Sequence, residues 1–113
     1  MTVVETPFFL RKAAPMLDEE ERSGLIVLLG MNPEAGDVIP ETGGVRKLRW
    51  AVQGKGKRSG VRVIYYFHNE LFPVFPLTVY AKNQKANLTK AERREFKKLV
   101  PVLVRTYAKG RLL

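Results

Sequence analysis

The sequence predicts an α+β fold, in which helices pack on a small antiparallel sheet. Two helix-start signals occur in the first third of the chain, three strand-like segments follow one another in the middle, and another helix-start signal lies near the end. Strands joined by short connections pair antiparallel, because a parallel pair needs a long crossover. We expect all helices to pack on one face of the sheet and to leave the other face free.

The first predicted helix follows a short predicted strand over residues 2–6. Thr6 and Pro7 form a favourable helix start, because threonine caps the first turn and proline fits the first helical position. The pattern predicts a helix over residues 7–16. Asp18 then predicts the cap of a second helix, whose first turn is acidic.

A turn-rich loop separates these helices from the predicted strands. The second helix is expected to end at Gly30, and residues 31–44 contain repeated glycine and proline. Alternating apolar and polar residues predict strands over residues 45–53, 61–68 and 74–82.

The last predicted element is a helix near the C-terminus. Thr89 and Glu92 have the spacing of a capping box, and an apolar stripe follows them opposite a basic one. Pro101 is expected to kink this helix or to end it early.

Length and composition limit the class of protein. The 113 residues suffice for one domain, residues 1–113, and 45% of them are apolar. No apolar run is long enough to span a bilayer, and the N-terminus lacks the basic start and apolar stretch of a signal peptide. The absence of cysteine excludes disulfides and thiol chemistry and fits a reducing cytoplasm.

The charge of the chain is high and unevenly distributed. Twenty Lys and Arg residues against eleven Asp and Glu residues give a net charge of +9. Residues 1–44 carry a balance of −5, whereas residues 45–113 carry +14. A surface of this density usually binds a polyanion, which could be nucleic acid, an acidic protein or anionic lipid. The plain alternative is a basic, solvated surface.

Alternation along the three strands predicts a basic face on the sheet. Side chains two residues apart on a strand lie on the same face. Arginine and lysine contact phosphate, and tyrosine stacks on bases or donates a hydroxyl group. The plain alternative is a solvated face whose long side chains snorkel to water. The residues expected to share this face are Lys47, Arg49, Arg62, Tyr66, Tyr80 and Lys82.

The residue types limit the chemistry that this face could perform. With no cysteine, one histidine and few carboxylates in the basic half, we expect neither a metal ion nor a cofactor. The segment GKGKRSG, residues 54–60, lacks the spacing of a phosphate-binding loop and precedes a strand instead of a helix. Cleavage of RNA needs no metal, because the 2′-OH attacks the adjacent phosphate and cations stabilise the developing charge.

Four segments of the sequence resemble the RelE/HigB toxins of bacterial toxin–antitoxin systems. The resemblance covers essentially the whole chain and implies the RelE/ParE fold, a small antiparallel sheet with two N-terminal helices and a C-terminal helix. It also implies a metal-independent endoribonuclease that cleaves mRNA in the ribosomal A site and stops translation. The segments are NPEAGDVIPETGG, GGVRKLRW, GKGKRSGVRVIYY and LTVYAKNQKANLT.

The resemblance also implies roles for individual residues. Arg62 and Lys82 would clamp the scissile phosphate. Lys47 or Lys57 would be the general base, and Tyr66 or Tyr80 would stack on a base or donate a proton. Where RelE has an arginine after the position of Lys82, this chain has Asn83, and its only late tyrosine is Tyr107. The residues expected to hold RNA are Arg46, Arg49, Lys55, Arg58 and Lys85.

The implied partners are mRNA, the 70S ribosome and a cognate antitoxin, often a helix-turn-helix protein that also binds operator DNA. Three other functions stay open. A toxin of the ParE branch would inhibit DNA gyrase through protein contact, an RNA- or ribosome-binding module would bind without cleavage, and a structural protein would pair its basic face with an acidic partner.

Overall fold

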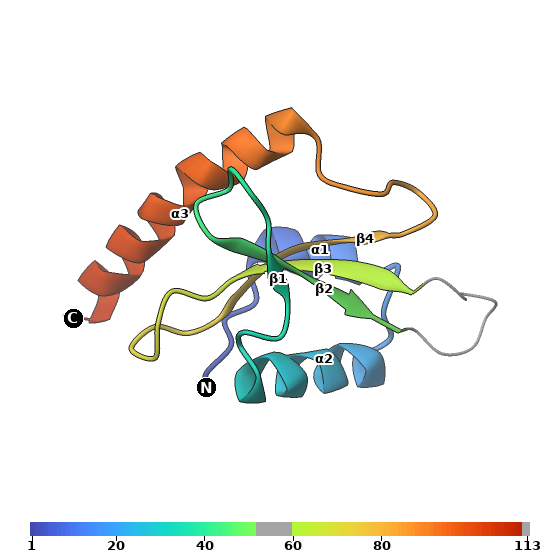
Figure 1. Ribbon diagram of the computed structural model, residues 1–113. Helices are drawn as coiled ribbons and strands as arrows, with labels where there is room; N and C mark the ends of the chain where they lie inside the picture. Colours follow the sequence, from blue (N-terminus) through green and yellow to red (C-terminus); the bar gives the residue numbers. More distant parts are fainter. Residues whose placement is uncertain (52–59, 112–113) are drawn as a thin grey trace.

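The computed structural model describes residues 1–51 and 60–111, which form three helices and a four-stranded antiparallel sheet (Figure 1). The strand order is β1-β2-β3-β4, so each strand pairs with its neighbour in sequence. This arrangement confirms the predicted α+β class. The elements are α1 (Pro7–Ala13), α2 (Glu19–Met31), β1 (Asp37–Val38), β2 (Val45–Trp50), β3 (Val61–Tyr66), β4 (Phe75–Ala81) and α3 (Lys90–Arg111).

The two N-terminal helices begin at the predicted caps. The Thr6 hydroxyl accepts a hydrogen bond from the Phe9 N–H at 3.2 Å. The Asp18 carboxylate accepts from the Glu21 N–H, and the Glu21 carboxylate accepts from the Asp18 N–H, which forms a capping box at the start of α2.

The ends of these helices differ from prediction by one to three residues. The first helix stops at Ala13. Ala14 keeps a helical backbone and donates to the Leu10 carbonyl, but Pro15 has no N–H that could continue the hydrogen-bond pattern. The second passes Gly30 to Met31, since the Asn32 N–H still donates to the Leu28 carbonyl. The strand predicted over residues 2–6 is reduced to one parallel bridge, between Val3 and Val74.

The sheet has two irregularities that the alternation pattern did not predict. The loop before β2 contains a two-residue strand, β1, which pairs with Arg46 and Lys47. On β4, Leu77 is an extra residue between the pairs Ile64–Thr78 and Tyr65–Pro76. This bulge shifts the alternation of β4 by one residue, so even-numbered side chains lie on opposite faces of the sheet before and after it.

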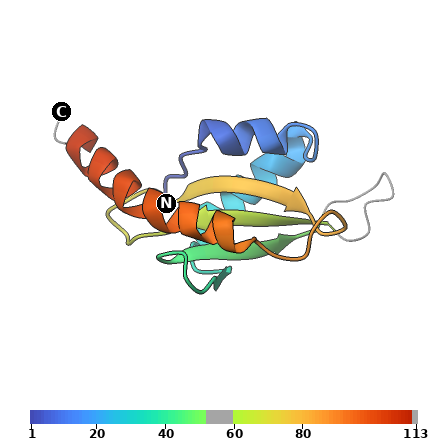
Figure 2. The ribbon, with the colours of Figure 1, turned by 90° about the horizontal axis from the view of Figure 1, so that it is seen from above.

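Helices cover both faces of the sheet, so the prediction that one face is free was wrong. We call the two sides the α1/α2 face and the α3 face. Figure 1 shows α3 on the opposite side of the sheet from α2, and Figure 2 shows α1 beside β4. On β3, Val63 and Tyr65 pack with the first two helices, whereas Ile64 and Tyr66 pack beneath α3. The apolar residues at both parities of β3 require cover on both sides.

The last helix continues through Pro101 to Arg111, so of the two expected outcomes, a kink or an early end, the early end was wrong. Proline leaves one carbonyl of the preceding turn, that of Lys97, without a helical partner. Both Lys97 and Pro101 are exposed, so water can satisfy this carbonyl. Within the described part of the chain, no helix is long and apolar enough to cross a membrane.

Candidate functional site

Three side chains form a row across the α3 face near one end of the sheet, and we call them the transverse row. In the strand register, Arg49 of β2 lies opposite Arg62 of β3, which in turn lies opposite Tyr80 of β4. Lys82 is the exposed residue that follows β4 directly, and its backbone N–H bonds Gly60, two residues before Arg62. The sheet thus brings together two of the predicted cations and one predicted tyrosine, with a third cation at the end of β4.

Gly60 allows the two flanking strands to approach at the end that carries this row. Its φ is +67°, and a Cβ at this position would lie 2.5 Å from the carbonyl oxygen of Trp50. The Gly60 carbonyl also accepts a hydrogen bond from the Lys82 N–H at 3.5 Å. The glycine therefore helps to fix both neighbours of β3 beside Arg62.

Arg62 is a buried cation with an unusual environment. The residue is only 7% exposed, and no carboxylate of residues 1–51 or 60–111 forms an ion pair with its guanidinium. Directly opposite stands a second cation, Arg49. Like charges opposite each other destabilise a sheet, and a buried unpaired charge costs free energy. An anion bound at this position would relieve both costs.

Tyr80 adds a buried hydroxyl group to the row. The residue is 6% exposed, and its hydroxyl has no hydrogen-bond partner among the described residues. The Lys85 ammonium lies 5.0 Å from the ring centroid. Burial raises the pKa of Tyr80, the guanidinium of Arg62 lowers it and the carboxylate of Glu92 raises it, with burial dominant. At neutral pH this hydroxyl is therefore protonated and can donate a hydrogen bond or a proton.

The Lys85 ammonium is held above Tyr80 by a carboxylate at the start of α3. It donates to Glu92 Oε2 at 2.5 Å, while the other oxygen of Glu92 accepts from the Thr89 N–H at 2.8 Å. Burial raises the pKa of Glu92, but the hydrogen bonds from Lys85 and Thr89 outweigh it and lower this pKa below its ordinary value. The predicted capping box is present, and its carboxylate also belongs to the site, a role that the sequence did not reveal.

Lys47 lies on the same face as the transverse row, two residues before Arg49 on β2. Its ammonium donates to the Asn87 side-chain oxygen at 3.1 Å. Lys47, Arg49 and Asn87 line a hollow of about 420 Å³, together with Arg93. Asn87 was not predicted, because a polar residue in an irregular connector carries no periodic signal.

The structure does not bring every predicted residue to this site. Tyr66 is 6% exposed, its hydroxyl bonds His68 Nδ1 at 2.8 Å, and it lies four residues along β3 from Arg62, about 13 Å away. Arg46 lies on the α1/α2 face, where its guanidinium donates to the Gly36 carbonyl at 2.7 Å. Tyr107 contacts the rings of Phe72 and Phe75 instead. Lys55, Lys57 and Arg58 lie outside the described residues.

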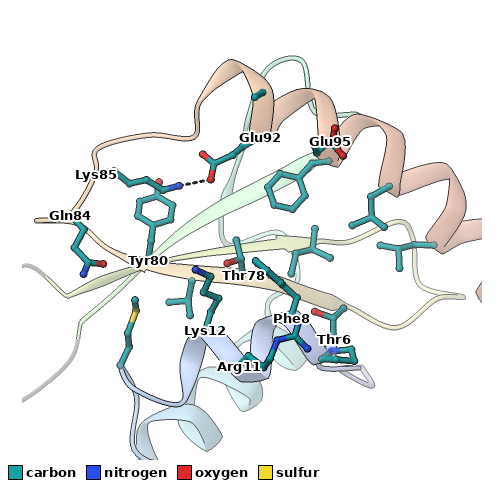
Figure 3. Close-up of a pocket in the computed structure, with 18 residues that line it drawn as sticks. Thr6, Phe8, Arg11, Lys12, Thr78, Tyr80, Gln84, Lys85, Glu92 and Glu95 are labelled. Carbon is teal, nitrogen blue, oxygen red and sulfur yellow. Dashed lines mark hydrogen bonds and ion pairs between the residues drawn. The ribbon is translucent and has the colours of Figure 1, made fainter.

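The site opens into a large groove, which Figure 3 shows in close-up. The groove has a volume of about 980 Å³ and lies between α1, β4 and α3. Tyr80, Lys85 and Glu92 lie at one end of it. Most of its other lining residues are apolar.

The arrangement is suited to binding an anion and donating a proton to it. Its charged groups are arginine and lysine with one tied carboxylate, and no group of three histidine, cysteine or acidic side chains that could hold a metal ion occurs in the described part of the chain. A protein-family model described as the RelE toxin of the RelE/RelB toxin–antitoxin system matches residues 36–110, more than half of the chain. The match includes the transverse row, Lys47 and the Lys85–Glu92 pair.

Proposed function

The chain belongs to the family of RelE toxins of toxin–antitoxin systems, and on this premise we propose that it is a ribosome-dependent endoribonuclease. In this proposal it enters the ribosomal A site, cleaves the mRNA there without a metal ion, and so inhibits translation. A cognate antitoxin holds it inactive, and this antitoxin also carries a helix-turn-helix domain that binds operator DNA.

The proposed reaction is an internal transfer of the phosphate. The ribose 2′-oxygen attacks the adjacent phosphorus, a bond forms between them, and the bond from phosphorus to the 5′-oxygen breaks. Lys47 or Lys57 accepts the proton of the 2′-OH, and Tyr80 donates one to the departing 5′-oxygen. Arg62 and Lys82 stabilise the charge that develops on the phosphate oxygens. The products are a 2′,3′-cyclic phosphate and a 5′-hydroxyl.

One observation carries the proposal: the transverse row holds a buried arginine without a carboxylate beside a buried tyrosine hydroxyl without a partner. Buried polar groups in a folded protein normally find partners within it. The Tyr80 hydroxyl has no partner among the described residues, and the Arg62 guanidinium bonds the Val61 carbonyl at 3.5 Å but no carboxylate. A proton donor and a cation side by side suit an oxyanion that arrives with the substrate.

The remaining cations would hold the RNA backbone and the ribosome. Arg49 belongs to the row and Lys85 lies beside Tyr80, while Lys55 and Arg58 belong to the segment of the sequence between β2 and β3. We leave Arg46 out of this surface, because its guanidinium is occupied on the other face. We also prefer Tyr80 to Tyr66 as the proton donor, because the hydroxyl of Tyr66 already bonds His68.

The experiment is primer extension on mRNA-programmed bacterial ribosomes mixed with the purified protein, beside a tube with the same mRNA and no ribosomes. Cuts confined to the A-site codon and to the tube with ribosomes are the expected result. Cuts in both tubes would retain the nuclease but reject its dependence on the ribosome. A folded protein that cuts in neither tube would reject the proposal, and a supercoiling assay would then test gyrase inhibition.

A further inference from the structure

The groove beside the site is lined by apolar side chains from three elements. Figure 3 shows β4 between the walls formed by α1 and α3, and the buried residues Leu77 and Val79 of this β4 floor line the groove. Phe8 remains 46% exposed on the α1 wall, an unusual degree of exposure for a phenylalanine. The opposite wall consists of Phe96, Leu99 and Leu103.

The α1 wall also carries two exposed cations. The Arg11 guanidinium and the Lys12 ammonium each lie 5.6 Å from the centroid of the Phe8 ring. Neither forms an ion pair with a carboxylate in residues 1–51 or 60–111. The α3 wall carries Glu95 instead, so the two rims differ in charge. An occupant would place its own carboxylates along α1.

The groove is continuous with the proposed catalytic end of the sheet. Tyr80 and Lys85 line it together with the apolar residues, so a chain lying in the groove would reach these two side chains. The ribose-phosphate backbone of mRNA could not contact the transverse row from this side while such a chain was bound.

We propose that this groove binds a segment of the cognate antitoxin, one that presents apolar side chains to the β4 floor and carboxylates to Arg11 and Lys12. The existence of an antitoxin follows from the family, and the consequence for catalysis rests on the proposed function. A second copy of this chain is a poor occupant, because each copy carries a net charge of +9. Nucleic acid does not use apolar walls of this extent, since its backbone is charged.

The experiment measures binding of the antitoxin encoded beside this gene to the purified toxin by isothermal titration calorimetry. Two toxin variants alter the groove, Phe8→Ala and the double variant Arg11→Glu/Lys12→Glu. Two matched controls lie elsewhere on the surface: Val27→Ala on α2, where Val27 is 59% exposed, and Arg94→Glu/Lys98→Glu on exposed positions of α3 outside the groove lining.

We expect both groove variants to weaken antitoxin binding by about tenfold or more, because a buried aromatic anchor or an opposed charge is lost. The controls should bind within about threefold of wild type. Unchanged binding by both groove variants would overturn the inference, as would equal losses in the controls. Circular dichroism melting verifies that each variant is folded.

The calorimetric result does not depend on RNA cleavage, so this proposal and the proposed function can fail separately. Phe8, Arg11 and Lys12 are not among the residues proposed to touch RNA. A groove variant should therefore cleave mRNA like wild type in the absence of antitoxin and resist its inhibition. A protein that binds antitoxin through the groove but never cleaves RNA would retain the interface and reject the nuclease.

Discussion

Two buried tyrosines on opposite faces of the sheet differ in whether their hydroxyl groups have partners. On the α1/α2 face, the hydroxyl of Tyr65 is fully used: it donates to the Pro33 carbonyl and accepts from the Gly36 N–H, both at 2.8 Å. On the α3 face, the hydroxyl of Tyr80 has no partner among the described residues, and the nearby guanidinium of Arg62 has no carboxylate. Both tyrosines are buried and both have a raised pKa, chiefly because of burial.

This difference separates stability from function within one small sheet. A buried hydroxyl group whose partners all lie within the protein contributes to folding and offers nothing to a ligand. A buried hydroxyl group without a partner leaves the fold less stable than it could be, and that cost is removed when a ligand supplies the missing partner. The following substitutions test whether the two faces divide these roles as we infer.

The largest effect is expected from a cavity under the α1/α2 face. Leu25 of α2 is fully buried in the cluster that includes Val63 and Tyr65. We expect Leu25→Ala to lower the free energy of unfolding by about 2–5 kcal/mol, because it removes buried apolar contacts and leaves a void. Urea denaturation measures the change. Val27→Ala on the exposed side of the same helix is the control and should change it by less than about 0.5 kcal/mol.

The second test compares two arginines on opposite faces. We expect Arg62→Gln to lower the rate of mRNA cleavage about 100- to 1,000-fold, because it removes a charge aimed at the developing oxyanion. Its free energy of unfolding should stay the same or rise, since an unpaired buried charge is removed. The measurements are single-turnover cleavage on programmed ribosomes and urea denaturation.

The matched variant is Arg46→Gln, which should behave in the reverse way. Arg46 donates to the Gly36 and Glu34 carbonyls and forms an ion pair with the Glu34 carboxylate. We expect it to lose about 1–3 kcal/mol of stability, because hydrogen bonds to a charged group are lost. Its cleavage rate should stay near that of wild type. If both arginines affected cleavage equally, the division between the faces would be wrong.

The sequence was sufficient for local structure and insufficient for the placement of α3. Thr6 and Asp18 are read correctly as caps, because a cap depends on residues within one turn. The bulge at Leu77 and the strand β1 depend on pairing with distant residues. Ile64 indicates that α3 covers this face, because an apolar side chain needs cover. It is a single apolar residue among side chains of the predicted basic face that otherwise looked polar.

The candidate site shows the same limit. Alternation correctly predicts that Arg49, Arg62 and Tyr80 share a face, because the period of two is a property of the strand alone. It gives Tyr66 equal standing, because the two tyrosines differ in a contact that alternation does not predict. The hydroxyl of Tyr66 bonds His68, whereas that of Tyr80 has no partner among the described residues. The Lys85–Glu92 contact joins a connector to a helix, and no local spacing rule predicts it.

The third test compares Tyr65 with Tyr80. Removing the hydroxyl of Tyr65 leaves the Gly36 N–H and the Pro33 carbonyl without partners, so we expect Tyr65→Phe to cost about 1–3 kcal/mol of stability. Tyr80→Phe removes an unpartnered group and should leave the free energy of unfolding unchanged or slightly higher. Cleavage should fall only in Tyr80→Phe. Equal destabilisation by both would mean that Tyr80 has a partner in the folded protein.

The smallest effect concerns Glu92, whose pKa is lowered in the folded protein. A lowered carboxyl pKa adds stability above the ordinary value of 4.5, and this contribution is lost as the pH falls through the folded-state pKa. Glu92→Gln keeps the capping box, because glutamine also fits that position, but it removes the ion pair with Lys85. The side chain of Glu92 is 38% exposed, so we expect a loss below about 1 kcal/mol at pH 7.

Urea denaturation of wild type and Glu92→Gln at several pH values should give a constant difference from pH 7 to about 5, which then shrinks toward zero as Glu92 becomes protonated. The double variant Lys85→Met/Glu92→Gln should show a smaller pH-dependent difference from Lys85→Met, because the hydrogen bonds from Thr89 still lower the pKa of Glu92 but those of Lys85 are absent. A difference that persists at pH 3 would show that Glu92 acts through its shape and not its charge. The ion pair would then have no part in holding Lys85 above Tyr80, and the α3 face would depend on the helix cap alone.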